Sequence, residues 1–521
     1  MRRMCKGLWA TLLALMICLA GATAWAEQGN LTGNLNNGGF VAQDESGVYL
    51  ADDGLWRADE RGKVQRLDDG EISRISLWED FVYYLKTWTE EGTVHGYRWN
   101  ADPQSGDETE FGYEESVGEV QMVAPYRVKK DGSGTVEQLG QARARSDGDS
   151  AYDGFTVVDG KIYYVAGNDQ PGQYTVMNQG QEVTVNYRFG NSIYRMDLDG
   201  QNVTELVGGL GNDYPRMAID GQTVYALTSY APCFNEGSIV GFLAANLDGT
   251  NVRPVVGSDR DYNWGQVSDL GNLSLEDCLQ AADGYLYIEQ LNGGTGVTDR
   301  LISRYSEDGT QHSQVAVILR GSAVLRDGKL YAICAPNDEW SEDGITPKAG
   351  VAVGIYEMDL ANPAQRRAVW TDHWFLADGY VYDADLSING DYAYVRKNQY
   401  DYSEEAGTQK QREIRRIGLS DGKVETLKDG VWSEAVDSEY YIADSDTRLL
   451  TRDELQNYSK EELGFIRNEI LARHGYPFKT EKYKEHFEAT SWYVRDEGFS
   501  YDRLSQLEQQ NVALIQELEK E

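Results

Sequence analysis

The chain has 521 residues, 41% of them hydrophobic, and a formal net charge of −37. This length exceeds what one ordinary hydrophobic core organises, so two or more domains or one large repeat array are expected. The strong acidic excess argues against nucleic acid or anionic lipid as a partner of the whole chain, since both would be repelled.

The first 26 residues have the pattern of a secretory signal peptide. Three basic residues lie within the first six, an apolar run follows over residues 8–19, and Ala24-Trp25-Ala26 fits a cleavage site. The apolar run is short for a bilayer span, which disfavours an uncleaved anchor. We therefore expect residues 1–26 to be removed. The mature chain would then be secreted or associated with the cell surface, with no membrane span and a net charge of −40.

A hairpin signature recurs from about Gly38 to Leu427. The clearest copy runs from Asp159 to Leu206 and contains two Asp-Gly pairs and two runs of alternating apolar residues. Asp-Gly tolerates the positive φ of tight hairpin turns, and apolar residues at every second position indicate strands. Openings of the same kind recur along the chain and include Tyr49, Tyr83, Tyr163, Tyr225, Tyr287, Tyr331 and Tyr382.

Constant hairpins at variable spacing predict a β-propeller, in which about four strands form each blade and the blades close into a ring. We predict about seven blades within residues 27–444. Six or eight are the alternatives, because ring closure often borrows a terminal strand. A tandem of β-sandwiches would need a linker that this region does not show.

Two stretches carry resemblances to known propellers. Ile162-Tyr163-Tyr164, together with Ile193 to Gly200, resembles the YWTD-type propeller of low-density lipoprotein receptor relatives. Gly33 to Ala42 is similar to the opening of a bacterial propeller family of unknown function. Both resemblances imply the propeller fold. Tyr-Trp-Thr-Asp is nowhere intact, so the ligand-binding mode of the receptors does not carry over.

Long polar insertions occupy residues 101–152, 168–191 and 398–412. We expect them to project from the blade edges. They would act either as solvated loops or as partner-binding loops.

The pattern becomes helical over residues 445–521, which predicts a small all-α domain. Thr451, Ser459 and Ser505 each precede a Glu by three residues, as in a capping box. Gly475 and Pro477 should end the central helix. The predicted buried faces consist of Leu463, Ile466 and Ile470 in that helix, and of Leu507, Asn511, Leu514 and Leu518 in the last one.

The run from Arg467 to Gly475, followed by Phe478, Phe487 and Trp492-Tyr493, resembles the YARHG domain, a small extracellular bacterial domain. The resemblance spans about residue 446 to the end, with Leu471 in place of the name-giving tyrosine. It implies a role at the bacterial cell envelope. The implied partner is a cell-wall or other envelope polymer, or an extracellular protein.

The candidate ligand-binding residues of this domain are Arg467, Asn468, Arg473, His474 and Trp492. Residues 467–484 carry five cations and two acids, a basic island that would attract an anionic polymer or a carboxylate-bearing peptide. Two structural interpretations stand beside this one. Arg473, His474 and Gly475 also suit a helix stop, because cations offset the helix dipole and glycine supplies a left-handed terminator. The island could instead dock on the acidic propeller.

No catalytic motif lies in a fitting context, and neither the histidines nor the three cysteines of the mature chain have metal-ligand spacing. We expect no cofactor and no metal, and buried cysteines that act as small hydrophobes. These features favour a secreted, non-enzymatic binding protein, with propeller loops for a protein or glycan and a C-terminal domain for the envelope. The alternatives are an extracellular glycan hydrolase or lyase with carboxylates on a propeller face, and a self-assembling surface protein.

Overall fold

Tight Asp-Gly turns join neighbouring strands at several places in the computed structural model. Asp159 and Gly160 both have positive φ, at 47° and 70°, and Val158 pairs with Lys161 across the turn. Asp283-Gly284 and Asp327-Gly328 repeat these signs of φ. The turns predicted from the sequence are therefore hairpin turns, made by residues that tolerate the left-handed region.

The structure describes residues 28–520 apart from 59–63, 100–110, 146–149, 169–171, 179–180, 188–189, 211–215, 231–238, 256–278, 292–298, 336–352, 373–375, 378–379, 382–383, 402–407, 429–430, 435–439, 443–444, 447, 456–457, 489 and 491. The predicted signal peptide, Cys233 and Cys278 lie outside the described residues. Cys334 is free and buried, as predicted.

The first four sheets are antiparallel, and their main strands follow chain order. The first contains β1 (Val41–Asp44), β2 (Gly47–Ala51), β3 (Leu55–Ala58) and β4 (Val64–Asp68). The second contains β5 (Glu71–Trp78), β6 (Phe81–Trp99), β7 (Phe111–Lys129), β8 (Glu137–Gln138) and β9 (Arg143–Arg145). The third contains β10 (Ala151–Val158), β11 (Lys161–Gly167), β14 (Asn191–Asp197) and β15 (Thr204–Val207). The fourth contains β16 (Arg216–Asp220), β17 (Thr223–Tyr230), β18 (Ile239–Asn246) and β19 (Arg253–Val255).

The next sheet has seven strands, because one long strand serves two neighbouring units. It contains β20 (Leu279–Ala282), β21 (Tyr285–Leu291), β22 (Asp299–Ser306), β23 (His312–Arg326), β24 (Lys329–Cys334), β25 (Gly354–Asp359) and β26 (Asn362–Thr371). The first half of β23 pairs with β22, and its second half, after a register shift, pairs with β24.

The last large sheet contains β29 (Ala384–Asn389), β30 (Tyr392–Asp401), β31 (Thr408–Gly418), β32 (Val424–Lys428) and β33 (Val431–Glu434). Two short hairpins are formed by β12 (Gly172–Asn178) with β13 (Gln181–Tyr187) and by β27 (Leu376–Ala377) with β28 (Tyr380–Val381). When β23 is counted in both of its units, the strands of the large sheets group into seven units of four or five strands within the described residues. The blade number of the whole ring stays a prediction.

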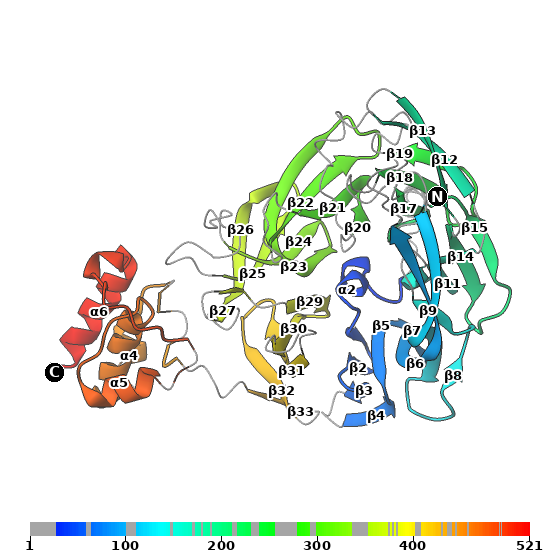
Figure 1. The fold of residues 1–521 in the computed structure, drawn as a ribbon. Helices are drawn as coiled ribbons and strands as arrows, with labels where there is room; N and C mark the ends of the chain where they lie inside the picture. Colours follow the sequence, from blue (N-terminus) through cyan, green and yellow to red (C-terminus); the bar gives the residue numbers. More distant parts are fainter. Residues whose placement is uncertain are drawn as a thin grey trace, which may run out of the picture.

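Apolar side chains pack between neighbouring sheets and close them into a ring. Phe40 and Tyr49 at the start share one core with Tyr394 and Ile414 of the last sheet. The Tyr394 hydroxyl also donates to Gln43 Oε1 at 3.1 Å. The sheets surround the short helix α2 (Thr32–Asn36), as Figure 1 shows. Closure of meander sheets into a ring is the β-propeller architecture that the sequence predicts.

An arginine near the end of the third strand reaches the next sheet at three places. Nη1 of Arg127, Arg195 and Arg304 donates to a leucine carbonyl of the neighbouring unit, at 2.9, 3.4 and 2.7 Å. The accepting residues, at the ends of third strands, are Leu198, Leu247 and Leu360. Leu198 and Leu247 begin Leu-Asp-Gly runs, so this part of the repeat makes a contact between blades.

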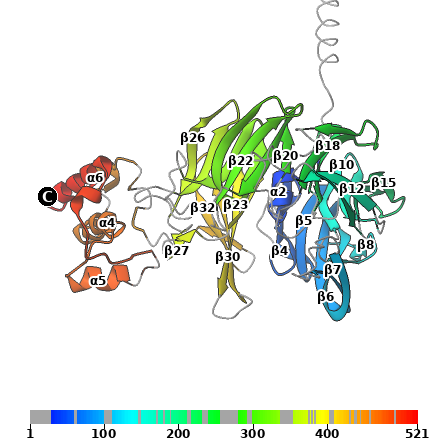
Figure 2. The same ribbon diagram turned by 45° about the horizontal axis from the view of Figure 1, so that its top comes forward.

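The polar insertions form β-hairpins on one face of the ring. β6 pairs with β7 over its whole length, so the predicted insertion at residues 101–152 contains a third strand that the sequence analysis missed. The insertion at 168–191 contains β12 and β13, and the one at 398–412 extends β30 and β31. The outer part of β6–β7, the hairpin β12–β13 and the extension of β30–β31 all lie where a second strand connects to a third, which places them on the same face of a propeller. We call this the hairpin face; Figure 2 shows β6–β7 and β30–β31 extending from the same side.

The C-terminal domain contains α3 (Arg452–Leu455), α4 (Lys460–Ala472), α5 (Glu481–Glu488), the 3₁₀ helix η4 (Tyr501–Arg503) and α6 (Gln506–Leu518). The capping boxes predicted at Ser459 and Ser505 are both present. The predicted face of α4 is buried. No helix of the described chain is long and apolar enough to span a membrane.

The buried face of α6 differs from the prediction, because it includes a carboxylate. Its buried residues are Glu508, Asn511, Val512, Ile515 and Leu518, whereas Leu507 and Leu514 are only half-buried. The domain also begins before the predicted boundary at residue 445. Ile442 belongs to its hydrophobic core, and Tyr441 stacks on Phe465 of α4 with ring centroids 5.5 Å apart.

Candidate functional site

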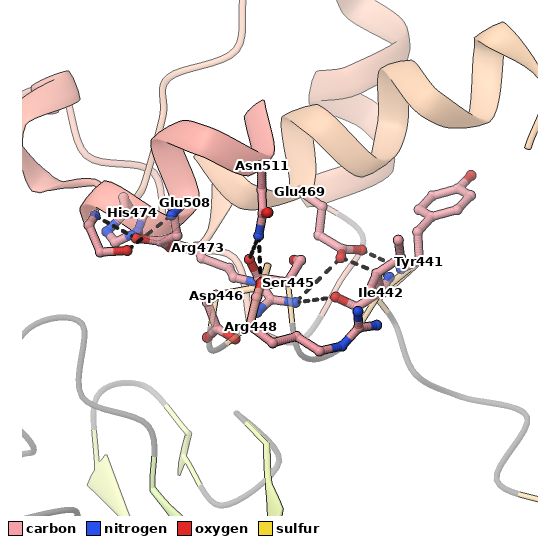
Figure 3. Close-up of polar contacts among 11 residues, drawn as sticks. Tyr441, Ile442, Ser445, Asp446, Arg448, Glu469, Arg473, His474, Glu508 and Asn511 are labelled. Atoms are coloured by element: carbon pink, nitrogen blue, oxygen red, sulfur yellow. Dashed lines mark hydrogen bonds and ion pairs between the residues drawn. The ribbon is translucent and has the colours of Figure 1, made fainter. Parts of the chain in front are cut away.

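Arg473, the C-cap residue of α4, lies inside the C-terminal domain. Its side chain is 2% exposed, and Nη2 donates to the Ile442 carbonyl at 3.0 Å (Figure 3). Asp446 Oδ1 lies 2.9 Å from Nη1, and Glu469 Oε1 lies 3.4 Å from Nη2. The guanidinium also sits 4.4 Å from the centroid of the Tyr440 ring. Arg473 therefore fixes residues 440–442 and 445–446, here called the lead-in segment, against the end of α4.

Glu469 holds the same segment from one turn earlier in α4. Its carboxylate is fully buried and accepts hydrogen bonds from the backbone N–H groups of Tyr441 and Ile442. Burial raises the pKa of Glu469 to about 7, against the opposing influence of the Arg473 charge and of the two backbone donors. Glu469 and Arg473 thus form a desolvated pair, and both side chains also bind backbone groups of the lead-in segment.

We expect Glu469→Gln to weaken the pH dependence of the C-terminal domain's stability. The folded pKa of about 7 lies above the usual 4.5, so the folded state binds more protons between these values. Stability contributed by this group is therefore present at low pH and lost as pH rises toward about 7. The loss is up to about 3 kcal/mol on the scale of 1.4 kcal/mol per pKa unit.

Urea unfolding of wild type and Glu469→Gln at pH 5 and pH 8, followed by hydrogen exchange in α4, measures this difference. The other acids of the chain titrate equally in both proteins, so each serves as the other's control. Identical pH dependence in the two proteins would contradict a titrating Glu469.

The other predicted site residues also have internal partners. His474 Nε2 lies 2.7 Å from Glu508 Oε1 on α6, with side chains 11% and 5% exposed. The buried Asn468 donates to the Gly464 carbonyl at 2.8 Å, and Arg467 pairs with Glu519. Trp492 stacks on Tyr440, with ring centroids 4.5 Å apart.

The five candidates do not converge on one open surface. Arg473 and Trp492 both contact the Tyr440 ring. His474 and Arg467 instead pair with Glu508 of α6 and with Glu519, the C-cap residue of α6. This arrangement supports the interpretation of the Arg-His-Gly run as a helix stop. Gly475 has φ +78°, and a Cβ there would lie 2.8 Å from Asp496 Cβ and from Val494 O. Sequence reasoning missed Tyr440, Asp446 and Glu508 as partners of Arg473 and His474, since nothing in their local pattern indicates contacts with the end of α4.

Two cations of the basic island are thus engaged inside the domain, and the remaining three are on or before α5. Lys479 is exposed, Lys484 lies 3.6 Å from Glu481, and Lys482 Nζ lies 4.7 Å from the Tyr483 ring centroid. Lys482 also lies 5.4 Å from the ring centroid of Phe465. We call these three residues the lysine surface. Its cations and aromatic rings are the groups of this domain best placed to meet an anionic polymer.

The described part of the chain also contains side chains of the types that could bind a metal ion. Within the residues that the structure describes, no group of three or more His, Cys, Asp or Glu side chains is arranged to hold a metal ion.

Several solved structures are similar to the chain at low sequence identity. They include a Mycobacterium tuberculosis puromycin-hydrolyzing peptidase (14% identity, 80% of this chain and 57% of that chain, TM-score 0.39). Acinetobacter baumannii TolB follows (10% identity, 76% and 78%, TM-score 0.28), as does a chain of a nidogen/laminin complex (13% identity, 58% and 88%, TM-score 0.29). TM-scores this low carry no argument about the fold. The propeller architecture therefore rests on the strand order and on the closure of the ring.

The sequence comparisons single out the C-terminal domain. No curated protein matches the chain. The family model of the YARHG domain matches residues 438–520, a range that includes the lead-in segment and all the helices from α3 to α6. The helical domain that follows the propeller is a YARHG domain.

Proposed function

We propose that this chain is a secreted, non-enzymatic binding protein. Its propeller would present the hairpin face to a protein or glycan, and its YARHG domain would associate with the cell envelope. A YARHG domain and a propeller-like fold are both consistent with an extracellular binding protein.

The lysine surface is the observation that carries the envelope part of this proposal. The whole chain has a net charge of −37, yet Lys479, Lys482 and Lys484 gather within six residues of one small domain. All three side chains are at least partly exposed, and Lys482 lies beside two aromatic rings. Anionic wall polymers would be attracted by the charges, and sugar rings could pack on the aromatic faces.

The hairpin face supports the propeller part. Three insertions of different length and sequence share this face, whereas tight turns such as Asp159-Gly160 and Asp283-Gly284 join first and second strands at the opposite face. Val117, in the outer part of β6–β7, is 77% exposed and so is accessible for an apolar contact. Variable loops held by a rigid scaffold are a common way for proteins to present a binding surface.

The test is co-sedimentation of the full chain with purified bacterial cell walls over a range of salt concentrations. We expect wild type to be retained at low salt and the variant Lys479→Glu/Lys482→Glu/Lys484→Glu to lose at least about tenfold in retention, because each reversed charge now repels an anionic polymer. The control is Lys460→Glu/Lys520→Glu, which reverses exposed cations outside the lysine surface.

Two outcomes would reject envelope binding by this surface: no retention of wild type at low salt, or equal loss of retention in the variant and the control.

A second variant tests the hairpin face. Replacing residues 94–116 by Asn-Gly closes β6–β7 after the pair Thr93 and Val117 without changing the register. Retention that persists at high salt should fall in this variant if the hairpin contacts the ligand.

A further inference from the structure

Residues 28–39, here called the axial segment, run through the middle of the ring before the first sheet begins. Figure 1 shows α2, the central part of this segment, enclosed by sheets from both halves of the propeller. The segment contains the Gly-Asn-Leu-Asn-Asn-Gly-Gly run that marks the start of the repeat region. Its contacts explain that run.

The start of the axial segment binds the inner strands of the second, third and fourth sheets. Gly29 N donates to Val157 O of β10 at 2.8 Å, and Leu77 N of β5 donates back to Gly29 O at 2.8 Å. The Gln28 side chain donates to Ile219 O of β16 at 3.0 Å. Asn30 joins the first two sheets, since its Nδ2 donates to Val41 O of β1 and to Ile75 O of β5 at 2.9 and 2.7 Å.

Three asparagines of α2 and its end bind the inner strands on the other side of the ring. Asn34 pairs with Ile388 of β29 in both directions: Nδ2 donates to Ile388 O at 2.9 Å, and Ile388 N donates to Oδ1 at 2.7 Å. Asn36 donates to Leu279 O of β20 at 2.8 Å. Asn37 donates to Leu386 O of β29 at 2.8 Å and to Ala323 O of β23 at 3.2 Å.

The innermost strand of every described unit therefore receives a hydrogen bond from this one segment. These strands are β1, β5, β10, β16, β20, β23 and β29. The inner edge of each has backbone groups with no neighbouring strand, and buried backbone groups of that kind need partners. A short primary amide offers both a donor and an acceptor, so asparagine can imitate a strand neighbour.

The glycines of the segment permit its close fit. A Cβ on Gly33 would collide with Gln280 of β20 and with the backbone of Val324. Gly39 has φ +56°, and a Cβ there would collide with the backbone of Arg74. Asn34 and Asn37 are at most 2% exposed. The segment thus fills the axis tightly, as a bound ligand would.

We propose that the propeller axis is a binding site for an amide-rich peptide and that the chain carries its own ligand for that site, residues 28–39. This inference does not depend on the proposed function. While the segment is in place, an external ligand meets only the faces of the ring. A peptide with the same sequence, including the segment of a second copy, is the ligand that this site would accept in trans.

The test uses a fluorescent peptide of residues 27–39 and the full chain from Glu27. In the chain variant Asn34→Ala/Asn37→Ala, the internal segment loses its bonds to β23 and β29 and should be displaced by the wild-type peptide. We expect this variant to bind the wild-type peptide at least about 100-fold more tightly than a peptide with both alanines, as several hydrogen bonds of about 1 kcal/mol each imply. The wild-type chain, whose site is filled, should bind neither peptide.

A folded variant that ignores the wild-type peptide, or that binds both peptides equally, would overturn the proposal. Hydrogen exchange in the single variant Asn34→Ala supplies a second measurement if the double variant does not fold. The Ile388 amide should exchange slowly in wild type and at least about tenfold faster in Asn34→Ala, because it loses its acceptor. Amides of β30, which pair only with strands, should change much less. Fast exchange at Ile388 in wild type would also overturn the proposal.

Discussion

Replacing Arg473 by alanine is expected to lower the free energy of unfolding of the YARHG domain by about 3–5 kcal/mol. Removal of one partner from a buried ion pair leaves the other charge uncompensated, and effects of this size are usual. Glu469 would remain fully buried, and the lead-in segment would lose its bond from Nη2 to the Ile442 carbonyl. Urea unfolding followed by hydrogen exchange in α4 measures the change, because it isolates this domain from the propeller.

Arg467→Ala is the matched control, since it removes the same charge from the same helix. Arg467 and its partner Glu519 are 25% and 19% exposed, so the expected cost is about 1 kcal/mol or less. The comparison separates a structural role from a binding role. If Arg473→Ala were as stable as Arg467→Ala yet lost retention on cell walls, Arg473 would be a ligand contact and the structural interpretation would fail.

Gly200→Ala is expected to destabilise the propeller by about 2–4 kcal/mol. Gly200 ends the Asp-Leu-Asp-Gly turn at φ +80°, a region that costs a residue with a Cβ about 1 kcal/mol. The added Cβ would also overlap the Leu139 carbonyl of the preceding sheet, and overpacking of this kind costs about 1–3 kcal/mol more. Thermal unfolding of the propeller, monitored by circular dichroism in the strand region, would report the loss.

Gly284→Ala separates the two contributions. Gly284 has φ +76°, but no atom lies within 4 Å of the position that its Cβ would take. Its substitution should therefore cost only the backbone contribution of about 1 kcal/mol. Equal effects at the two glycines would mean that the contact of the Asp-Leu-Asp-Gly turn with the neighbouring sheet adds no stability.

The two turns look alike in the sequence, although only at Gly200 would an added Cβ meet a neighbouring sheet. The sequence predicts the turn itself but not this packing. Asp-Gly predicts a hairpin at both sites because the requirement for positive φ is local. Whether the turn then packs against another sheet depends on residues far away, such as Leu139 for Gly200. The same holds for β7, whose polar residues read as a loop until pairing with β6 makes them a strand.

The predicted binding residues of the YARHG domain also show the difference between local preference, which the sequence reveals, and distant contacts, which it does not. The signature from Arg467 to Gly475 located the domain and the end of its central helix, because capping and helix termination act within a few residues. The signature could not show that Arg473 is buried, since its partners Tyr440, Ile442 and Asp446 lie about thirty residues earlier. The structure leaves the lysine surface as the exposed part of the basic island.

The sequence by itself determined the strands' turns, the ring of repeated units and the helical end of the chain, all of which follow from periodicity and local backbone preference. Only the tertiary structure decided which polar residues are buried and which partners they bind. Asn34 and Asn37 became partners of inner strands because the ring brings β23 and β29 to the axis. The pKa of Glu469 is raised because the folded domain buries its carboxyl group. Burial and pairing depend on which distant segments meet, and no local pattern encodes that.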